Sequence, residues 1–282
     1  MKILIVGAKG MLGQELATVF SDSTLILWDK NDLDITNGEV VEKKIEELRP
    51  ELIINSAAYN NVDACETNFE LAKAVNGDGP INLAKAAEKV EATFIHYSTD
   101  YVFEGTKESG YNEDDQPAPI SKYGESKLFG ERVLDYCKRC YVIRTSRLYG
   151  LPAVSDGAKK SFVDVMLKLA EDKDSLEVVD EEFSNPTYVV DLALKTRELF
   201  DGKLPHGLYH VVNEGACTWY EFATEIFKLA DKGVTIKPVA STVYNRPAKR
   251  PKYSSLINNK LPKLRNWREA LAAYLIQREK TL

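Results

Sequence analysis

The chain has 282 residues, of which 44% are hydrophobic and 28% charged, and this composition excludes a disordered or collagen-like chain. Its 37 Lys and Arg residues against 43 Asp and Glu residues give a formal net charge of −6, which argues against nucleic acid or an anionic membrane as a partner. Any anionic ligand must therefore be held by a local site.

The expected location of the protein is the cytoplasm. Every apolar run falls short of the ~18 residues that a membrane helix needs, and the N-terminal run stops at Gly7, too early for a secretory signal. Four cysteines suit a reducing compartment. Cys137 and Cys140 form a C-x-x-C pair without a partner motif for zinc, so ordinary thiols are expected.

Short apolar runs alternate with helical patterns through the first half of the chain. Strands are predicted at residues 2–6, 24–29, 52–55, 93–98 and 141–145, and helices at 11–20, 39–48, within 71–90 and at 121–140. Continuous apolar strands separated by helices are typical of a parallel sheet covered on both faces. The expected fold is therefore α/β, with a doubly wound parallel Rossmann sheet.

The pattern changes after the fifth predicted strand. Beyond it, short strands and helices are separated by loops rich in Pro, Asn and Lys. We predict a first domain at residues 1–148 and a second, smaller mixed α/β domain at 149–282. A return of the chain to the first sheet near 186–200 stays open.

A glycine-rich turn, GAKGMLG, follows the first strand and opens the first helix. Gly7 permits the tight turn, Gly10 lets the backbone approach a pyrophosphate, and Gly13 lets helix and strand pack closely. The start of the helix adds the N–H groups of Met11 and Leu12 and the positive end of the helix dipole. This context predicts a dinucleotide-binding turn.

The G-x-x-G-x-x-G spacing resembles the extended short-chain dehydrogenase/reductase superfamily. Asp29, at the end of the second strand, is placed to accept hydrogen bonds from a ribose and favours NAD, whereas Lys30 could receive the 2′-phosphate of NADP. Both cofactors stay open. The resemblance further implies adenine contacts and a lining for the cofactor cleft, at Asp34, Ile35, Ala57, Ala58 and Tyr59.

A tyrosine and a lysine four residues apart, Tyr123 and Lys127, would project from one face of a helix. Free tyrosine, with a pKa of about 10, is a weak acid. An ammonium ~5 Å from the phenolate, at an effective dielectric of ~20, supplies about 3 kcal/mol, or roughly 2.4 pKa units. We therefore expect Tyr123 to titrate near neutrality. Thr99, at a strand end, could donate a hydrogen bond to a substrate carbonyl.

Several strings in the chain resemble the dTDP-4-dehydrorhamnose reductase family. They are FIHYSTDYVF at 94–103, Tyr123–Lys127 with Gly130 and Glu131, Arg144-Thr145-Ser146, Ala57-Ala58-Tyr59 with Val62, Asp63 and Glu66, and Arg250-Pro251 with Ser254. The resemblance implies a cytoplasmic enzyme that reduces the 4-keto group of a dTDP-6-deoxyhexose with NADH or NADPH. It makes residues 1–148 the NAD(P)-binding domain and 149–282 mainly the substrate domain.

The same resemblance assigns roles to the site residues. Tyr123 gives the proton, Lys127 tunes it and hydrogen-bonds the nicotinamide ribose, and Thr99 orients the carbonyl. Residues expected to bind the sugar or its phosphates are Asn60, Thr99, Asp100, Tyr101, Val102, Tyr123, Arg147, Asn185 and Arg250. Asn60, Arg147 and Tyr253 replace the Thr, Trp and Asn usual in the family, so the identity of the sugar and of the nucleotide stays open.

Two other readings of the chain remain. One is another nucleotide-sugar reductase, epimerase or dehydratase, although Thr99-Asp100-Tyr101 lacks the glutamate of the T-D-E string typical of dehydratases. The other is a non-catalytic NAD(P)-binding subunit similar to the beta subunit of methionine adenosyltransferase. Some family members bind magnesium at a dimer contact, where Glu15 and Glu269 would stand, but we expect no metal site. A monomer and a homodimer both fit.

Overall fold

The computed structural model describes residues 1–155 and 160–281, and a six-stranded parallel sheet forms its centre. The strand order is β2-β1-β3-β4-β5-β9. The bounds are β1 (Lys2–Val6), β2 (Thr24–Trp28), β3 (Leu52–Asn55), β4 (Thr93–Thr99), β5 (Cys140–Thr145) and β9 (Gly207–His210). The chain winds outward from β1 in both directions, which confirms the expected doubly wound α/β fold.

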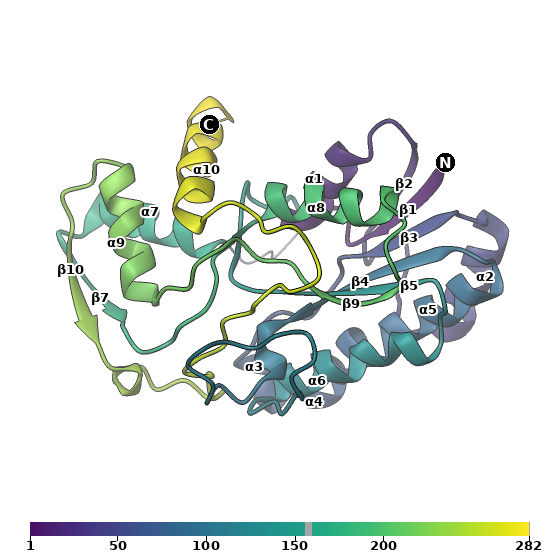
Figure 1. Ribbon diagram of the computed structural model, residues 1–282, viewed down its shortest axis with the longest axis horizontal. Coiled ribbons are helices and arrows are strands. Elements are labelled where there is room, and N and C mark those ends of the chain that lie inside the picture. Colours follow the sequence, from purple (N-terminus) through teal and green to yellow (C-terminus); the bar gives the residue numbers. More distant parts are fainter. Residues whose placement is uncertain (156–159, 282) are drawn as a thin grey trace.

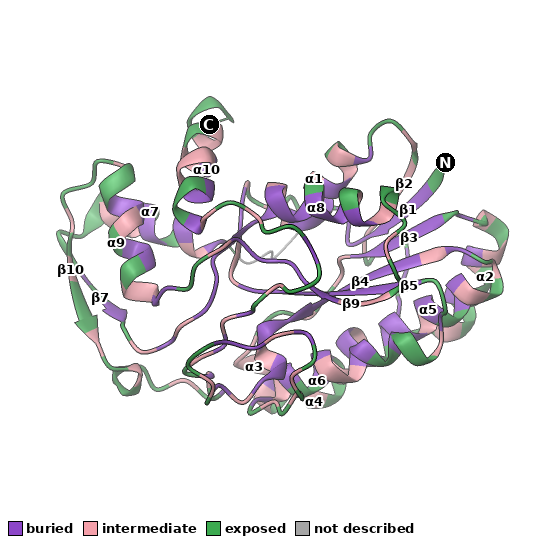
Figure 2. Ribbon diagram, in the orientation of Figure 1, coloured by how far each residue is buried: buried purple, intermediate pink, exposed green. Residues whose placement is uncertain are grey.

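Helices cover both faces of this sheet (Figure 1). On one face lie α1 (Met11–Val19) and α8 (Val189–Asp201), and on the other lie α2 (Gly38–Leu48), α5 (Gly79–Lys89) and α6 (Lys122–Gly130). Side chains of β1 alternate between the two cores: Ile3 and Ile5 pack on the α1 side, and Leu4 and Val6 on the α2 side. Because both faces are buried (Figure 2), the strands carry continuous apolar runs.

The connection between β3 and β4 is broken into short pieces. It contains α3 (Ala64–Thr67), α4 (Phe69–Lys73), a π-helical turn η1 (Ala74–Asp78) and then α5. Asn76, in the π-helical turn, is fully buried. The sequence predicted plain helix in this region, because helical periodicity does not reveal a π-helical turn.

The helix predicted at residues 121–140 is shorter in the structure. It ends at Gly130 and continues as a 3₁₀ turn, η3 (Glu131–Asp135), and β5 already begins at Cys140. The Glu131 carboxylate turns inward and accepts two hydrogen bonds from the buried guanidinium of Arg144 on β5, at 2.8 and 2.7 Å. This ion pair holds the segment after α6 against β5. All four cysteines are buried free thiols.

A second lobe lies beside the sheet (Figure 1). It holds the parallel pair β7 (Ser175–Val179) and β10 (Thr235–Val239), with α7 (Phe162–Asp172), α9 (Trp219–Leu229) and α10 (Trp267–Thr281). Short strands β6 (Leu148–Tyr149) and β8 (Thr187–Tyr188) and the 3₁₀ turns η2 (Asp100–Val102) and η4 (Ser241–Val243) complete the structure. Within the second half of the chain, α8 packs on α1 and β9 pairs with β5 at the edge of the first sheet.

Within the described residues 1–155 and 160–281, no helix is both long enough and apolar enough to cross a membrane.

The buried Glu131–Arg144 pair predicts a large loss of stability on Glu131→Ala. The change leaves the Arg144 guanidinium buried without its partner, which should lower the free energy of unfolding by about 3–5 kcal/mol. The matched control is Glu125→Ala on the preceding helix α6, whose exposed ion pair with Lys122 should contribute less than about 1 kcal/mol. Urea unfolding of both variants makes the comparison, and equal losses would contradict it.

Candidate active site

The glycine-rich turn is folded tightly between β1, β2 and the segment after β3. Gly7 has a φ of +77°, and its amide donates to the Trp28 carbonyl at 2.8 Å. A Cβ added to Gly7 would lie 2.6 Å from the Ala57 nitrogen, and one added to Gly13 would lie 2.3 Å from the Gly7 carbonyl oxygen. Neither position can hold a larger residue without moving the backbone, so both glycines fit their expected roles.

The start of α1 has free hydrogen-bond donors. Its first helical hydrogen bond runs from Gln14 N to the Gly10 carbonyl at 3.1 Å. The N–H groups of Met11, Leu12 and Gly13 therefore have no partner one helical turn earlier, and Gly10 has no side chain to cap them. Such a helix start suits a pyrophosphate, so the residues present fit a dinucleotide cofactor.

Acidic side chains follow β2 at the same edge of the sheet. The Asp29 carboxylate accepts a hydrogen bond from Lys30 N at 2.9 Å, and Lys30 itself is exposed. Asp34 accepts bonds from the hydroxyl and the amide of Thr36, and the hydroxyl bond is the main reason that the pKa of Asp34 is lowered. Ile35, next to it, is buried. Asp29 thus keeps a carboxylate at the position expected for ribose recognition.

Asn76 fixes the loop after β3, which holds Ala57, Ala58 and Tyr59. Its side-chain amide accepts from Tyr59 N at 2.8 Å and donates to the Tyr59 carbonyl at 2.9 Å. A further bond of 3.0 Å runs to the Ser126 hydroxyl on α6. The sequence reasoning missed this residue, although the helix breakers that follow it, Gly77 and Gly79-Pro80, were an available signal.

Lys127 is a buried amine at the centre of the site. Only 3% of the residue is exposed, and its Nζ donates to the Tyr97 carbonyl on β4 at 2.6 Å. Burial lowers the pKa of Lys127 to about 8, and the negative charge of Glu131 acts in the opposite direction. The amine is therefore poised to titrate within the physiological range of pH.

Tyr123 stands one helical turn before Lys127, with its ring edge-on to Tyr101 at a centroid distance of 5.8 Å. Gly124 allows the close approach, because a Cβ there would lie 2.2 Å from the Tyr101 carbonyl oxygen. The expectation that Tyr123 titrates near neutrality is wrong. Burial and then the charge of Asp100 raise the pKa of its phenol, while a hydrogen bond with Thr99 lowers it less.

Thr99 ends β4, and its hydroxyl donates to the Asp100 carboxylate at 2.9 Å and accepts from Tyr101 N at 3.2 Å. A hydroxyl has one proton, so Thr99 cannot also donate to a substrate carbonyl in this arrangement. The Asp100 carboxylate is buried and accepts further bonds from the hydroxyls of Ser184 and Ser254. Asp100 is therefore held by three hydroxyls of the protein, and its expected contact with substrate stays a prediction.

Arg147 is also held by the protein itself. Its φ is +44°, and its guanidinium donates to the carbonyl oxygens of Cys217 at 2.8 Å and Glu182 at 2.6 Å. The guanidinium also lies over the Trp219 ring, 3.9 Å from its centroid. These bonds use two of the five N–H groups of the guanidinium, so the expected contact of Arg147 with a sugar or phosphate stays a prediction.

The remaining residues expected to bind substrate form two groups, those held or buried within the protein and those that are at least partly exposed. Arg250 forms a two-pronged ion pair with Asp63 at 2.6 and 2.7 Å, and the Asn185 side chain bonds only to backbone groups. Val102 is fully buried, which argues against a side-chain contact with substrate. Asn60 is exposed, and Tyr101 and Tyr123 are partly exposed.

The two glutamates considered for magnesium lie apart within one chain. Glu15 hydrogen-bonds with Gln277 on α10. Gln277 comes eight residues after the exposed Glu269, which corresponds to about 12 Å along the helix. Within residues 1–155 and 160–281, no group of three or more His, Cys, Asp or Glu side chains could hold a metal ion.

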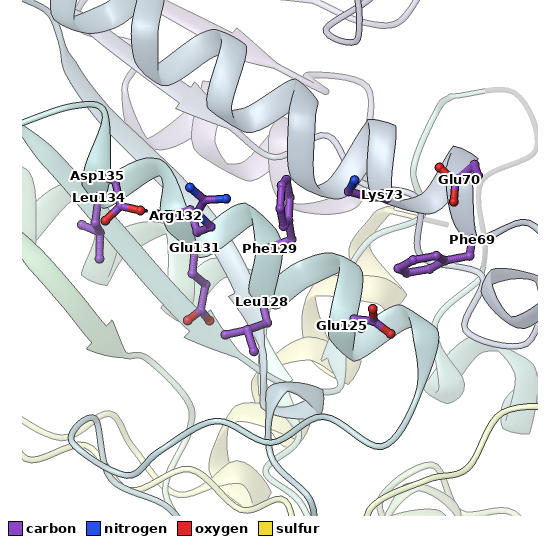
Figure 3. A pocket seen from close by; sticks show the side chains of 10 residues that line it. All are labelled: Phe69, Glu70, Lys73, Glu125, Leu128, Phe129, Glu131, Arg132, Leu134 and Asp135. Atoms are coloured by element: carbon purple, nitrogen blue, oxygen red, sulfur yellow. Dashed lines mark hydrogen bonds and ion pairs between the residues drawn. The ribbon is translucent and has the colours of Figure 1, made fainter.

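A surface groove of about 620 Å³ lies between α4, α6 and η3 (Figure 3). Phe69, Leu128 and Phe129 supply apolar lining, and Glu70, Glu125 and Arg132 stand around it. Neither Tyr123 nor Lys127 lines this groove, so it is separate from the candidate active site.

Comparison with known proteins gives consistent matches over almost the whole chain. A model of the family described as "RmlD substrate binding domain" matches residues 1–279. A dTDP-4-dehydrorhamnose reductase of Streptomyces griseus is 38% identical over 95% of this chain and 91% of its own.

Two crystal structures share the fold closely. A dTDP-4-dehydrorhamnose reductase of Clostridium acetobutylicum is 40% identical, with a TM-score of 0.93 over 99% of this chain and 100% of that chain. The enzyme of that name from Bacillus anthracis, in complex with NADP, is 37% identical, with a TM-score of 0.92 over 98% of this chain and 99% of that chain.

The packing of the glycine-rich turn predicts that Gly13→Ala impairs cofactor binding. The added methyl would meet the Gly7 carbonyl and Ala8, and strain of this kind costs about 1–3 kcal/mol, so NADH binding should weaken about 5- to 150-fold. Gly233→Ala is the matched control, since a Cβ there meets nothing within 4 Å. Fluorescence titration with NADH measures both, and an unchanged affinity in Gly13→Ala would refute the role of the turn.

Proposed function

Because this chain belongs to the RmlD substrate binding domain family, we propose that it reduces the 4-keto group of dTDP-4-dehydrorhamnose to dTDP-rhamnose with NADH or NADPH. The observation that carries this proposal is the position of Tyr123 and Lys127 against the end of β4. A dinucleotide turn stands at the same edge of the sheet, where open α/β sheets bind ligands.

The cofactor would be held by the turn and by the loops that follow β2 and β3. We propose that the N–H groups of Met11, Leu12 and Gly13 bind its pyrophosphate and that Asp29 or Lys30 sets the preference for NADH or NADPH. Asp34, Ile35, Ala57, Ala58 and Tyr59 would surround its adenosine and nicotinamide parts. When bound, the reduced cofactor supplies a hydride to the C4 carbonyl.

Tyr123 would supply the proton that the sugar oxygen then needs. The raised pKa keeps the phenol protonated at neutral pH, so the acid is present in the form that reduction requires. An alkoxide on the sugar is a stronger base than a phenolate, so proton transfer from Tyr123 is downhill even from a phenol that is weaker than usual. Burial thus favours donation to a substrate charge over loss of the proton to water.

Lys127 would hold the ribose of the cofactor and keep Tyr123 in place. Its bond to the Tyr97 carbonyl fixes the amine, which leaves two of its three protons for other acceptors. We propose that Asn60 and Tyr101 meet the sugar and that Arg250, paired with Asp63, contributes positive potential near the diphosphate.

The proposed proton donor gives a direct test. Tyr123→Phe removes the acidic proton and should lower kcat for dTDP-4-dehydrorhamnose at least about 100-fold while NADH affinity stays unchanged. Tyr136→Phe makes the same change on the outer surface after η3 and should leave kcat as it is. Stopped-flow oxidation of NADH measures both. NADH binding without any turnover in the unaltered chain would instead support the non-catalytic alternative.

The lowered pKa of Lys127 predicts a pH dependence. In the free protein the amine is protonated below pH 8 and loses its charge as the pH rises through about 8. Because kcat/KM reports the free enzyme, kcat/KM for NADH should fall above that pH with a slope of one proton. Lys127→Met should abolish this limb, whereas Lys122→Met, at an exposed lysine of the same helix, should keep it. A limb that persists in Lys127→Met would contradict the assignment.

A further inference from the structure

We propose that Glu131 is a positioning residue for the Lys127 amine, because together with Ser98 it makes a second contact between the end of α6 and β4 that holds the amine on its strand carbonyl. This inference deepens the role given to Lys127 and rests on the proposed function for its catalytic meaning. The contacts themselves are properties of the folded chain.

Lys127, Glu131 and two residues of β4 form a closed ring of hydrogen bonds. The Lys127 amine donates to the Tyr97 carbonyl at 2.6 Å, and the next residue on β4, Ser98, donates its hydroxyl to the Glu131 carboxylate, also at 2.6 Å. The ring closes through the backbone, where the Glu131 N–H donates to the Lys127 carbonyl. All four residues are buried, with exposed fractions of 3–8%. The end of α6 is therefore attached to two successive residues of β4.

The Tyr97 carbonyl is available to the amine because β4 is longer than β3. Backbone groups of a parallel strand point alternately to the strands on its two sides, and the Thr93 amide donates to the residue before β3 at 3.0 Å. Tyr97 comes four residues later and points to the same side, but β3 ends at Asn55, which pairs with His96. The Lys127 amine thus takes the place where a longer β3 would donate.

The Glu131 carboxylate is seated on a buried polar row that crosses three strands. Ser98 on β4, Arg144 on β5 and His210 on β9 lie in register. Arg144 donates to both oxygens of Glu131, at 2.8 and 2.7 Å, and its other terminal nitrogen lies 3.4 Å from His210 Nε2. A guanidinium only donates, so His210 Nε2 accepts and Nδ1 donates to the Ile257 carbonyl at 3.1 Å. The carboxylate is therefore fixed through both oxygens and can hold Ser98 in turn.

Titratable groups near the Lys127 amine belong to three elements. Glu131 follows on η3, Tyr123 precedes it by one turn of α6, and His96 stands on β4. Burial and then the charge of Lys127 lower the pKa of His96, so its imidazole is uncharged at neutral pH. Glu131 carries the negative charge that raises the pKa of Lys127 against the effect of burial. Exposure of the amine to water and loss of this charge must therefore shift its pKa in opposite directions.

Ser98→Ala opens the ring and keeps every charge. The end of α6 then loses its second contact with β4 and the amine gains access to water, so the pKa of Lys127 should rise by at least about half a unit toward the 10.4 of free lysine. The readout is carbon-13 NMR of lysine labelled at Cε in the full-length protein without ligands, with Lys127→Met to assign the resonance. An unmoved titration in folded Ser98→Ala overturns the inference.

Ser161→Ala is the matched control. Ser161 is 4% exposed and its hydroxyl donates to the Asp164 carboxylate at 2.7 Å, so this variant loses the same kind of bond in the second lobe. Both variants should be less stable in urea, whereas only Ser98→Ala should move the Lys127 titration. A Lys127 shift of equal size in both would show a general effect of lost stability and would overturn the inference.

Glu131→Gln makes the opposite change. The amide keeps an oxygen that can accept from Ser98, so the ring stays closed, but the negative charge is lost. The pKa of Lys127 should therefore fall below its value of about 8, by at least about half a unit. A pKa that is unchanged or higher in Glu131→Gln overturns the inference even if Ser98→Ala does not fold.

Activity is assayed separately from these titrations. In a chain that reduces dTDP-4-dehydrorhamnose, the alkaline limb of kcat/KM for NADH should move with the pKa of Lys127 in each variant. A wild-type chain without this activity overturns the proposed function, and the titration of the ligand-free protein still decides the role of Glu131.

Discussion

The hydrogen bond from the Lys127 amine to the Tyr97 carbonyl, 2.6 Å long, joins α6 to β4 where both carry the groups proposed for catalysis. It fixes the depth of α6 on the sheet, so that Tyr123 stands beside Thr99. Gly124 allows the start of the helix to come close to the Tyr101 carbonyl, and Asn76 ties the same helix to the loop after β3. The pair proposed for catalysis is therefore built on a sheet edge and a helix.

Burial gives this anchored pair its chemistry. Removal from water lowers the pKa of the amine and raises that of the phenol, so both groups shift toward their neutral forms. The simple electrostatic account, in which an ammonium makes the phenol acidic, omitted this desolvation and gave the wrong direction. A protonated Tyr123 next to a carbonyl is still suited to reduction, because its proton is needed only after charge develops on the substrate oxygen.

The fold could be predicted from sequence, and the pair proposed for catalysis could be found there, because both depend on local patterns. Apolar strands, the glycine turn and the four-residue spacing of Tyr123 and Lys127 are all short-range signals. The partners of the charged groups could not be predicted, since they come from distant parts of the chain. Arg147 donates to the carbonyls of Glu182 and Cys217, and Glu131, after the end of α6, pairs with Arg144 on β5.

The proposed chemistry depends most on the burial of the Lys127 amine, and direct titration of that amine tests whether it is buried. Carbon-13 NMR of lysine labelled at Cε, with Lys127→Met to assign the resonance, would give its pKa in the free protein. We expect a value of about 8, set by burial against the Tyr97 carbonyl. A value near the 10.4 of free lysine would show a solvated amine and contradict the account.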